Sequence, residues 1–144
     1  MSGKQPKRLP RPGIDEYGRT RLHYAACDGD LRAVATLLAD GAAIDLQDDN
    51  GWTPLHFAAQ ASSEEVTAYL LDHGASIDLE DSHGNTALST ATFNSRGEGA
   101  VIRVLRAAGA DPKKKNKHGV SALSLARTIA NYNVAQFFDD IKEA

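Results

Sequence analysis

The sequence Thr53-Pro54-Leu55-His56-Phe57-Ala58-Ala59 predicts a short helix, because its first two residues are typical of a helix N-terminus. A threonine hydroxyl accepts a hydrogen bond from a free amide at a helix N-terminus, and proline suits the next position because it has no amide hydrogen that would need a partner there. The leucine and the alanines form a narrow apolar face that lets a neighbouring helix come close. Just before this segment, Asp49-Asn50-Gly51-Trp52 predicts a turn in which the glycine adopts a positive φ.

A second helix is expected to begin at Ser62, because Ser62-Ser63-Glu64-Glu65 is typical of a capping box. Apolar and aromatic side chains then follow at helical spacing through Val66, Tyr69 and Leu70. Gly74 comes shortly after them and suits the left-handed residue that ends many helices. Residues 48–80 are therefore predicted to form a turn and two helices.

The same pattern recurs along the chain. Turn glycines lie at Gly18, Gly51, Gly84 and Gly119, with spacings of 33, 33 and 35 residues. A hydroxyl residue follows each of them by two positions, at Thr20, Thr53, Thr86 and Ser121. Further glycines end the second helical stretch of a unit, at Gly41, Gly74 and Gly109. A repeat of this length is typical of a solenoid, and the two additional residues of the third unit are expected within 94–99.

Residues 53–59 and the segment Leu70-Leu71-Asp72-His73-Gly74-Ala75 resemble the ankyrin repeat, and Thr20-Arg21-Leu22-His23-Tyr24-Ala25-Ala26 shows the same motif. The resemblance covers residues 15–144 and implies an all-α solenoid of four helix-turn-helix units joined by β-hairpin-like turns. The units are expected at 15–47, 48–80, 81–115 and 116–144, after a basic, proline-containing arm at 1–14. A last helix at Val134–Ile141 is expected to close the stack.

Composition is typical of one globular domain. The chain has 144 residues, 42% hydrophobic residues and one cysteine, Cys27, which excludes an internal disulfide. No apolar stretch is long enough to span a membrane and no signal peptide is apparent, so a cytoplasmic location is expected. The net charge of −3 hides a strong segregation, because residues 15–109 hold fifteen acidic and six basic residues whereas 1–14 and 113–117 are basic.

The sequence holds no pattern typical of an enzyme, a cofactor site or a metal site. The resemblance gives His23 and His56 a structural role, since the histidine of the family motif ties turns and helices together by hydrogen bonds. His83 and His118 precede turn glycines and are candidates for contact with a partner. Cys27 is expected to be a half-buried, inert thiol. We therefore predict no catalytic residue, no cofactor and no bound metal.

Lys113-Lys114-Lys115-Asn116-Lys117 leaves two interpretations open. It is either a site for an anionic partner or a solvated loop before the last unit. The solvated loop is favoured, because no aromatic side chain alternates with the lysines to stack on nucleic-acid bases. The acidic body of the chain also disfavours nucleic acid as a partner.

Partners of ankyrin repeats usually meet the loop tips and the first helix of each unit, and the resemblance carries these positions over to this chain. The predicted partner-binding residues are Tyr17, Arg19, Asp49, Asn50, Trp52, His83, Asn85, Phe93, Asn94 and Arg96. No core demands a large side chain at the turn position of Trp52, which is therefore either a binding hot spot or a cover for the next turn. Residues 94–99 are expected to form a flexible finger that carries Arg96 towards a partner.

These features favour a non-enzymatic protein-binding module that is monomeric when free. The chain is similar to small stand-alone ankyrin proteins of bacteria, some of which are immunity proteins that neutralise a toxin. An acidic body suits a basic protein partner, such as a toxin that acts on nucleic acid. Two alternatives stay open: an intracellular adaptor that binds a resident protein, and an enzyme or nucleic-acid-binding protein that uses the lysine run. Neither nucleic acid nor a membrane is the expected partner.

Overall fold

A computed structural model of the protein describes residues 12–129 and 131–141. Within them lie seven α-helices and one 3-10 helix, η1, and no β-strand. The elements are α1 (Arg21–Cys27), α2 (Leu31–Ala39), α3 (Pro54–Gln60), α4 (Glu64–Asp72), α5 (Ala87–Asn94), α6 (Ala100–Ala107), α7 (Ala122–Thr128) and η1 (Val134–Phe138). Most of the basic arm predicted at 1–14 falls outside the described residues.

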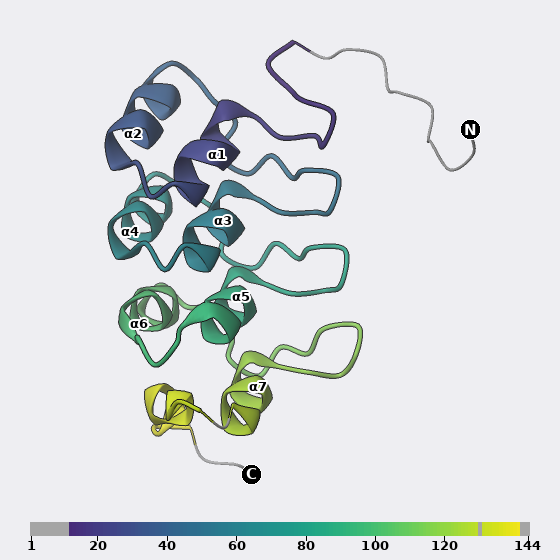
Figure 1. Ribbon diagram of the computed structural model, residues 1–144, viewed down its shortest axis with the longest axis vertical. Helices are drawn as coiled ribbons and strands as arrows, with labels where there is room; N and C mark the ends of the chain where they lie inside the picture. The colour runs from purple at the N-terminus through teal and green to yellow at the C-terminus, as the bar shows by residue number, and fades with distance from the viewer. Residues whose placement is uncertain (1–11, 130, 142–144) are drawn as a thin grey trace, which may run out of the picture.

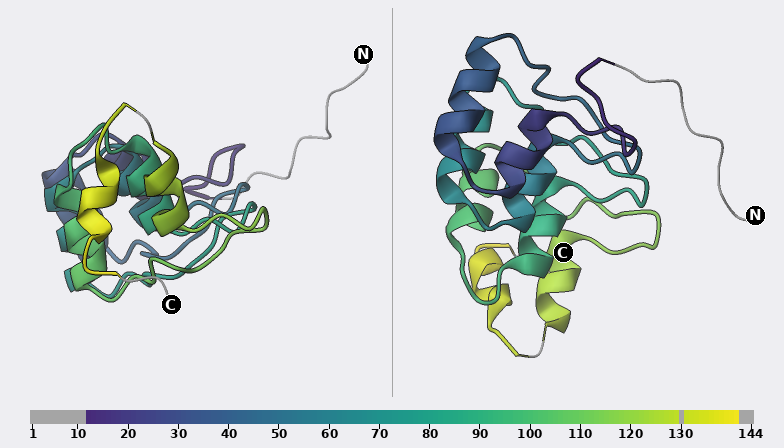
Figure 2. Two further views of the ribbon diagram at one scale, coloured as in Figure 1. Left: turned by 90° about the horizontal axis from the view of Figure 1, so that it is seen from below. Right: turned by 45° about the horizontal axis from the view of Figure 1, so that its top comes forward.

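The helices form two layers, and long loops project from one of them (Figure 1). The inner layer consists of α1, α3, α5 and α7, which pack on one another in this order, and α2, α4 and α6 stack behind it as the outer layer. The loops that precede the inner helices extend side by side, away from the outer layer (Figure 2). We call the surface formed by the inner helices and the adjoining side of these loops the concave face. The arrangement confirms the predicted all-α solenoid, while the unit boundaries stay a prediction.

The core lies between the two layers. Equivalent leucines of the inner helices pack there against branched side chains of the outer helices. These residues are Leu22, Leu55, Leu88 and Leu123 from the inner layer and Val34, Val66, Leu70, Ile102 and Leu105 from the outer layer, none more than 6% exposed. Ala26, Ala58 and Ala59 are fully buried, which agrees with their expected role in close helix packing.

The residues that cap the beginnings and ends of the helices are largely those predicted. Thr20, Thr53, Thr86 and Ser121 are the N-cap residues of the four inner helices. The Thr53 hydroxyl accepts a hydrogen bond from the His56 amide at 3.3 Å. The glycines after the outer helices, Gly41, Gly74 and Gly109, have φ values of 92°, 94° and 101° and are the left-handed residues expected there.

The cap of α4 differs from the prediction by one residue. The Ser63 hydroxyl, and not that of Ser62, caps the helix by accepting a hydrogen bond from the Val66 amide at 3.3 Å. Ser62 has a φ of 54° because the tight turn between an inner and an outer helix needs a left-handed residue. Gly29 fills the equivalent place before α2 with a φ of 66°.

The additional residues of the third unit do not form the expected flexible finger. They join α5 to α6 and lie against the C-terminal segment. A Cβ atom on Gly97 would lie 3.2 Å from a ring carbon of Tyr132, and one on Gly99 would overlap the ring of Phe137. Ser95 is buried, whereas the side chains of Arg96 and Glu98 are exposed. Gly97 and Gly99 therefore hold the segment against the last unit, while Arg96 and Glu98 face solvent.

The C-terminal segment also differs from the prediction, because a 3-10 helix at Val134–Phe138 replaces the helix expected over Val134–Ile141. Acidic residues at the end of an α-helix face the negative end of its dipole, which disfavours a longer helix here. Arg106 of α6 instead binds Asp140 through two hydrogen bonds of 2.6 and 2.7 Å and donates to the carbonyl of Phe137 at 2.9 Å. Val134 and Phe138 are nevertheless fully buried.

Two buried histidines tie inner helices to the following loop. His23 and His56 are 0% and 1% exposed. In each ring Nδ1 accepts a hydrogen bond from the backbone amide of the N-cap residue, at 2.9 and 3.1 Å. Nε2 therefore carries the proton, and it donates to the Leu46 carbonyl at 2.8 Å from His23 and to the Asn85 carbonyl at 2.9 Å from His56. These bonds have the structural role that the resemblance implied.

Acidification is expected to destabilise the fold through these two histidines. Burial lowers the pKa of both side chains below the ordinary value of 6.5, so both stay neutral in the folded protein while the unfolded chain takes up protons. The free energy of unfolding should therefore fall as the pH drops below 6.5, by up to about 1.4 kcal/mol per histidine and pH unit until the lowered pKa is reached. Urea denaturation at about pH 7.5 and about pH 5.5 measures this change. A stability that is equal at both pH values would contradict the expectation.

Candidate functional site

The four loops before the inner helices share one backbone geometry. The amide of the residue three positions before the turn glycine donates to the carbonyl of the residue after it, at 2.8–2.9 Å, in the pairs Asp15–Arg19, Asp48–Trp52, Asp81–Asn85 and Asn116–Val120. One backbone hydrogen bond joins each loop to the next, from Asp49 to Tyr17, from Ser82 to Asn50 and from Lys117 to His83. The loops therefore form a continuous wall on one side of the concave face (Figure 2). We call it the loop wall.

A side-chain oxygen braces each loop of this wall. Oδ1 of Asp15, Asp48, Asp81 and Asn116 accepts two backbone amides of its own loop, at 2.8–3.0 Å. The residue after the turn glycine, in contrast, differs in every loop: Arg19, Trp52, Asn85 and Val120. This variable position therefore sets the chemistry of each layer of the wall.

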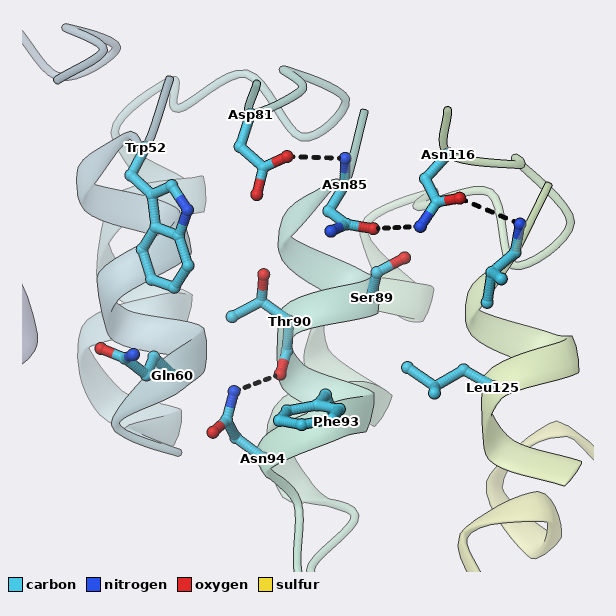
Figure 3. A pocket seen from close by; sticks show the side chains of 11 residues that line it. Trp52, Gln60, Asp81, Asn85, Ser89, Thr90, Phe93, Asn94, Asn116 and Leu125 are labelled. Atoms are coloured by element: carbon cyan, nitrogen blue, oxygen red, sulfur yellow. Dashed lines mark hydrogen bonds between the residues drawn. The ribbon is translucent and has the colours of Figure 1, made fainter. Parts of the chain in front are cut away.

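A groove with a volume of about 330 Å³ lies between the loop wall and the helices α3, α5 and α7 (Figure 3). We call it the central groove. The wall contributes Trp52, Asp81, Asn85, Asn116 and Val120, and the helices contribute Gln60, Ser89, Thr90, Phe93, Asn94 and Leu125. The lining of the groove thus combines aromatic and apolar side chains with amides and hydroxyls, and it includes a single carboxylate. Such a mixture is typical of the surfaces by which proteins bind one another.

Trp52 borders the central groove and is half-buried against its own helix. The centroid of its ring system lies 4.9 Å from that of Phe57 and 5.6 Å from that of His56. The indole is therefore held by packing on one side and lines the groove on the other (Figure 3). Rigid aromatic groups of this kind lose little conformational entropy when a partner covers them.

An arginine takes the equivalent place in the preceding loop. Nε of Arg19 donates to Oδ2 of the buried Asp48 at 3.0 Å. Its guanidinium carbon also lies 5.1 Å from the ring centroid of Tyr17 and 5.2 Å from that of Phe57. Arg19 thereby neutralises Asp48 and covers two aromatic rings within the same protein.

A second hollow, with a volume of about 440 Å³, adjoins the central groove and shares Trp52, Gln60, Asp81 and Asn85 with it. Arg19, Asn50, Phe57, Ser82 and His83 complete its lining. The two hollows bring together seven of the ten predicted partner-binding residues, namely Arg19, Asn50, Trp52, His83, Asn85, Phe93 and Asn94. That these residues contact a partner stays a prediction.

The other three predicted residues lie outside both hollows. Tyr17 is 53% exposed on the first loop, and Asp49 is exposed on the second. Arg96 lines a separate hollow at the end of α5, together with Phe93 and Tyr132. Phe93 is 71% exposed and connects this region to the central groove.

The lysine run and the two loop-tip histidines lie at the far end of the wall. Lys114 is 3.8 Å from Glu80 in a solvent-exposed ion pair, which contributes little to stability. The exposed rings of His83 and His118 have centroids 5.9 Å apart. Residues 12–129 and 131–141 contain no group of three or more histidine, cysteine or acidic side chains that could hold a metal ion. In the same part of the chain, no helix is long and apolar enough to cross a membrane.

Sequence reasoning missed Asp81, which lines both hollows. Asp81 and Asp48 occupy equivalent positions of the repeat, and no role was predicted for either of them. The two aspartates differ in the residue that follows the turn glycine of the preceding loop. Arg19 supplies a cation to Asp48, whereas the equivalent residue before Asp81 is Trp52, which has no charge.

Comparison with known families agrees with this architecture. Residues 22–116 match the family of ankyrin repeats, in three copies. No curated protein matches the chain. The matched segment extends from α1 to the last loop and contains most of the central groove. Ankyrin repeats are non-enzymatic modules that bind other proteins. The chain therefore belongs to the ankyrin repeat family.

Proposed function

We propose that the protein is an immunity protein, which binds a basic protein toxin with its concave face and thereby blocks it. The central groove carries this proposal, because Trp52 and Phe93 border a polar floor that includes the buried carboxylate of Asp81. Aromatic side chains are enriched where proteins bind one another, and Phe93, which is 71% exposed, offers one beside the groove. The excess of acidic residues over 15–109 attracts a basic partner over longer distances.

Binding alone is sufficient for this function. A toxin that acts on nucleic acid needs a basic surface to hold phosphate groups. An acidic inhibitor competes for that surface and closes it to the substrate, without any catalytic step of its own. In this role the protein meets the toxin in the cytoplasm, where the thiol of Cys27 stays reduced.

Simultaneous replacement of Trp52 and Phe93 by alanine is expected to weaken binding of the partner by at least about 30-fold, because truncation of an aromatic hot spot costs about 2–4 kcal/mol. Tyr69→Ala is the matched control, since Tyr69 is a half-buried aromatic residue of the outer helix α4. The tagged wild-type protein captures partners from a lysate of the source organism, and mass spectrometry identifies them. Binding constants of the purified partner are then measured for all three proteins, after circular dichroism has verified that each is folded.

The decisive step is a growth assay with the captured partner. A basic protein that is toxic when expressed alone should be neutralised by the wild type and by Tyr69→Ala, but not by the double variant. A resident, non-toxic partner would contradict the immunity role and favour an adaptor instead. Full neutralisation by the folded double variant would contradict the choice of surface.

A further inference from the structure

The carboxylate of Asp81 is buried at the junction of the two hollows without a cationic partner among the described residues. Asp81 is 7% exposed. Its Oδ1 accepts the amides of His83 and Asn85, each at 2.9 Å, whereas Oδ2 forms no hydrogen bond or ion pair with a described residue. Figure 3 shows this second oxygen directed into the space between Trp52 and Asn85. Because the charged Oδ2 faces the hollows and has no donor among the described residues, this position favours a cation.

The preceding layer of the same protein shows what such a carboxylate binds. Asp48 is equivalent to Asp81 in the repeat, and its Oδ1 also accepts two loop amides, at 2.8 and 2.9 Å. Its Oδ2, however, accepts the hydrogen bond from Arg19, whose guanidinium lies over aromatic rings. The layer of Asp48 therefore has a complete set of carboxylate, arginine and aromatic rings, whereas the layer of Asp81 has no arginine among the described residues.

The incomplete set has the aromatic component in place. Trp52 stands where the first loop has Arg19, and its indole borders both hollows next to Asp81. The amide group of Gln60 lines both hollows as well and offers a further acceptor. The positive charge of the nearby Arg19 is neutralised by Asp48, so it does not oppose a second cation.

We propose that Asp81, Trp52 and Gln60 form a pocket for the guanidinium of an arginine side chain of the protein partner. This inference rests on the proposed protein-binding function and specifies the chemistry of its central contact. The guanidinium donates hydrogen bonds to Oδ2 of Asp81 and lies against the face of the Trp52 indole. Arginine fits better than lysine, because a planar group both stacks on a ring and donates several hydrogen bonds in its plane.

The single tryptophan of the chain, Trp52, makes the pocket directly observable by its fluorescence. Hexa-arginine is the probe, and hexalysine is the control of equal charge. We expect hexa-arginine to change the Trp52 emission in a saturable manner, with an affinity about tenfold or more above that of hexalysine. Equal affinities of the two peptides, or an emission that does not respond to hexa-arginine, would overturn the proposal.

Asp81→Asn tests the carboxylate without disturbing the loop. The next loop has Asn116 at the equivalent position, and its Oδ1 accepts two loop amides at 2.8 and 3.0 Å, just as Asp81 does. Asp72→Asn is the matched control, because it removes the same charge from an exposed position on the outer helix α4. Asp81→Asn should weaken hexa-arginine binding about tenfold or more, since a hydrogen bond to a charged group is lost. Asp72→Asn should change it by no more than about twofold.

Equal losses in the two variants would mean that the peptide binds through diffuse charge, and would overturn the pocket. This result leaves the proposed function intact, because that function is judged separately by neutralisation of the toxin. If the partner is neutralised by the wild type and equally by Asp81→Asn, the immunity role stands and the arginine pocket fails. If no toxic partner exists but hexa-arginine binding depends on Asp81, the pocket stands and the immunity role fails.

Discussion

Replacing His56 by alanine is expected to lower the free energy of unfolding by about 3–4 kcal/mol. The side chain is 1% exposed and lies between α3 and the following loop. Its removal leaves the Asn85 carbonyl and the Thr53 amide without the hydrogen bonds that the ring formed at 2.9 and 3.1 Å. A cavity of the size of an imidazole adds to this loss.

Urea denaturation of the variant at about pH 7.5 measures this effect, because both buried histidines are neutral there. His118→Ala is the control, since His118 is exposed at a loop tip and its ring contacts the ring of His83. We expect that control to change stability by no more than about 0.5 kcal/mol. A loss below about 1 kcal/mol for His56→Ala would mean that the ring does not hold neighbouring repeats together.

Replacing Gly51 by alanine is expected to be more destabilising than the same change at Gly119, although both residues have nearly the same backbone conformation. Their φ values are 80° and 77°, which cost an alanine about 1–2 kcal/mol. At Gly51 the new Cβ would also lie 2.8 Å from Cα of Asp81 and 3.0 Å from the Ser82 nitrogen. At Gly119 it would meet no described atom within 4 Å.

The comparison separates the conformational penalty from the close approach of two loops. Overpacking against a backbone costs about 1–3 kcal/mol, so Gly51→Ala should lose about 2–5 kcal/mol and Gly119→Ala about 1–2 kcal/mol. The urea midpoints of the two variants and of the wild type measure these losses. Equal losses would indicate that the loops of the wall yield easily and do not depend on a glycine for their stacking.

Local chemistry explains why the sequence predicted most of the fold. A hydroxyl side chain such as Thr53 caps a helix, and a glycine such as Gly74 ends one, because the interactions involve residues only a few positions apart. Ser62 and Val134–Ile141 were predicted less well. Ser62 is subject to a turn that demands a left-handed residue, and the C-terminal segment is held by contacts with Arg106, 34 residues before Asp140.

The candidate site was predictable to the extent that it follows from position in the repeat. Partners of ankyrin repeats usually meet loop tips and first helices, and this resemblance pointed to Trp52, Asn85 and Phe93 before the structure showed that they share the central groove. The segment at 94–99 was misjudged, because glycines indicate freedom of the backbone and not the presence of a neighbour. Gly97 and Gly99 in fact make room for the rings of Tyr132 and Phe137.

The sequence alone determined the repeat and the limits of most helices, because these depend on short-range chemistry that recurs every 33–35 residues. The roles of His23 and His56 were implied by the resemblance to the ankyrin repeat, and their hydrogen bonds to Leu46 and Asn85 reach 23 and 29 residues along the chain. The tertiary structure alone distinguished Asp81 from Asp48. The two carboxylates have the same local surroundings, and they differ only in what the stacked loop before them supplies, a guanidinium in one case and an indole in the other. That difference arises between layers of the solenoid, where residues about thirty positions apart meet, and it leaves the carboxylate of Asp81 without a guanidinium such as the one that binds Asp48.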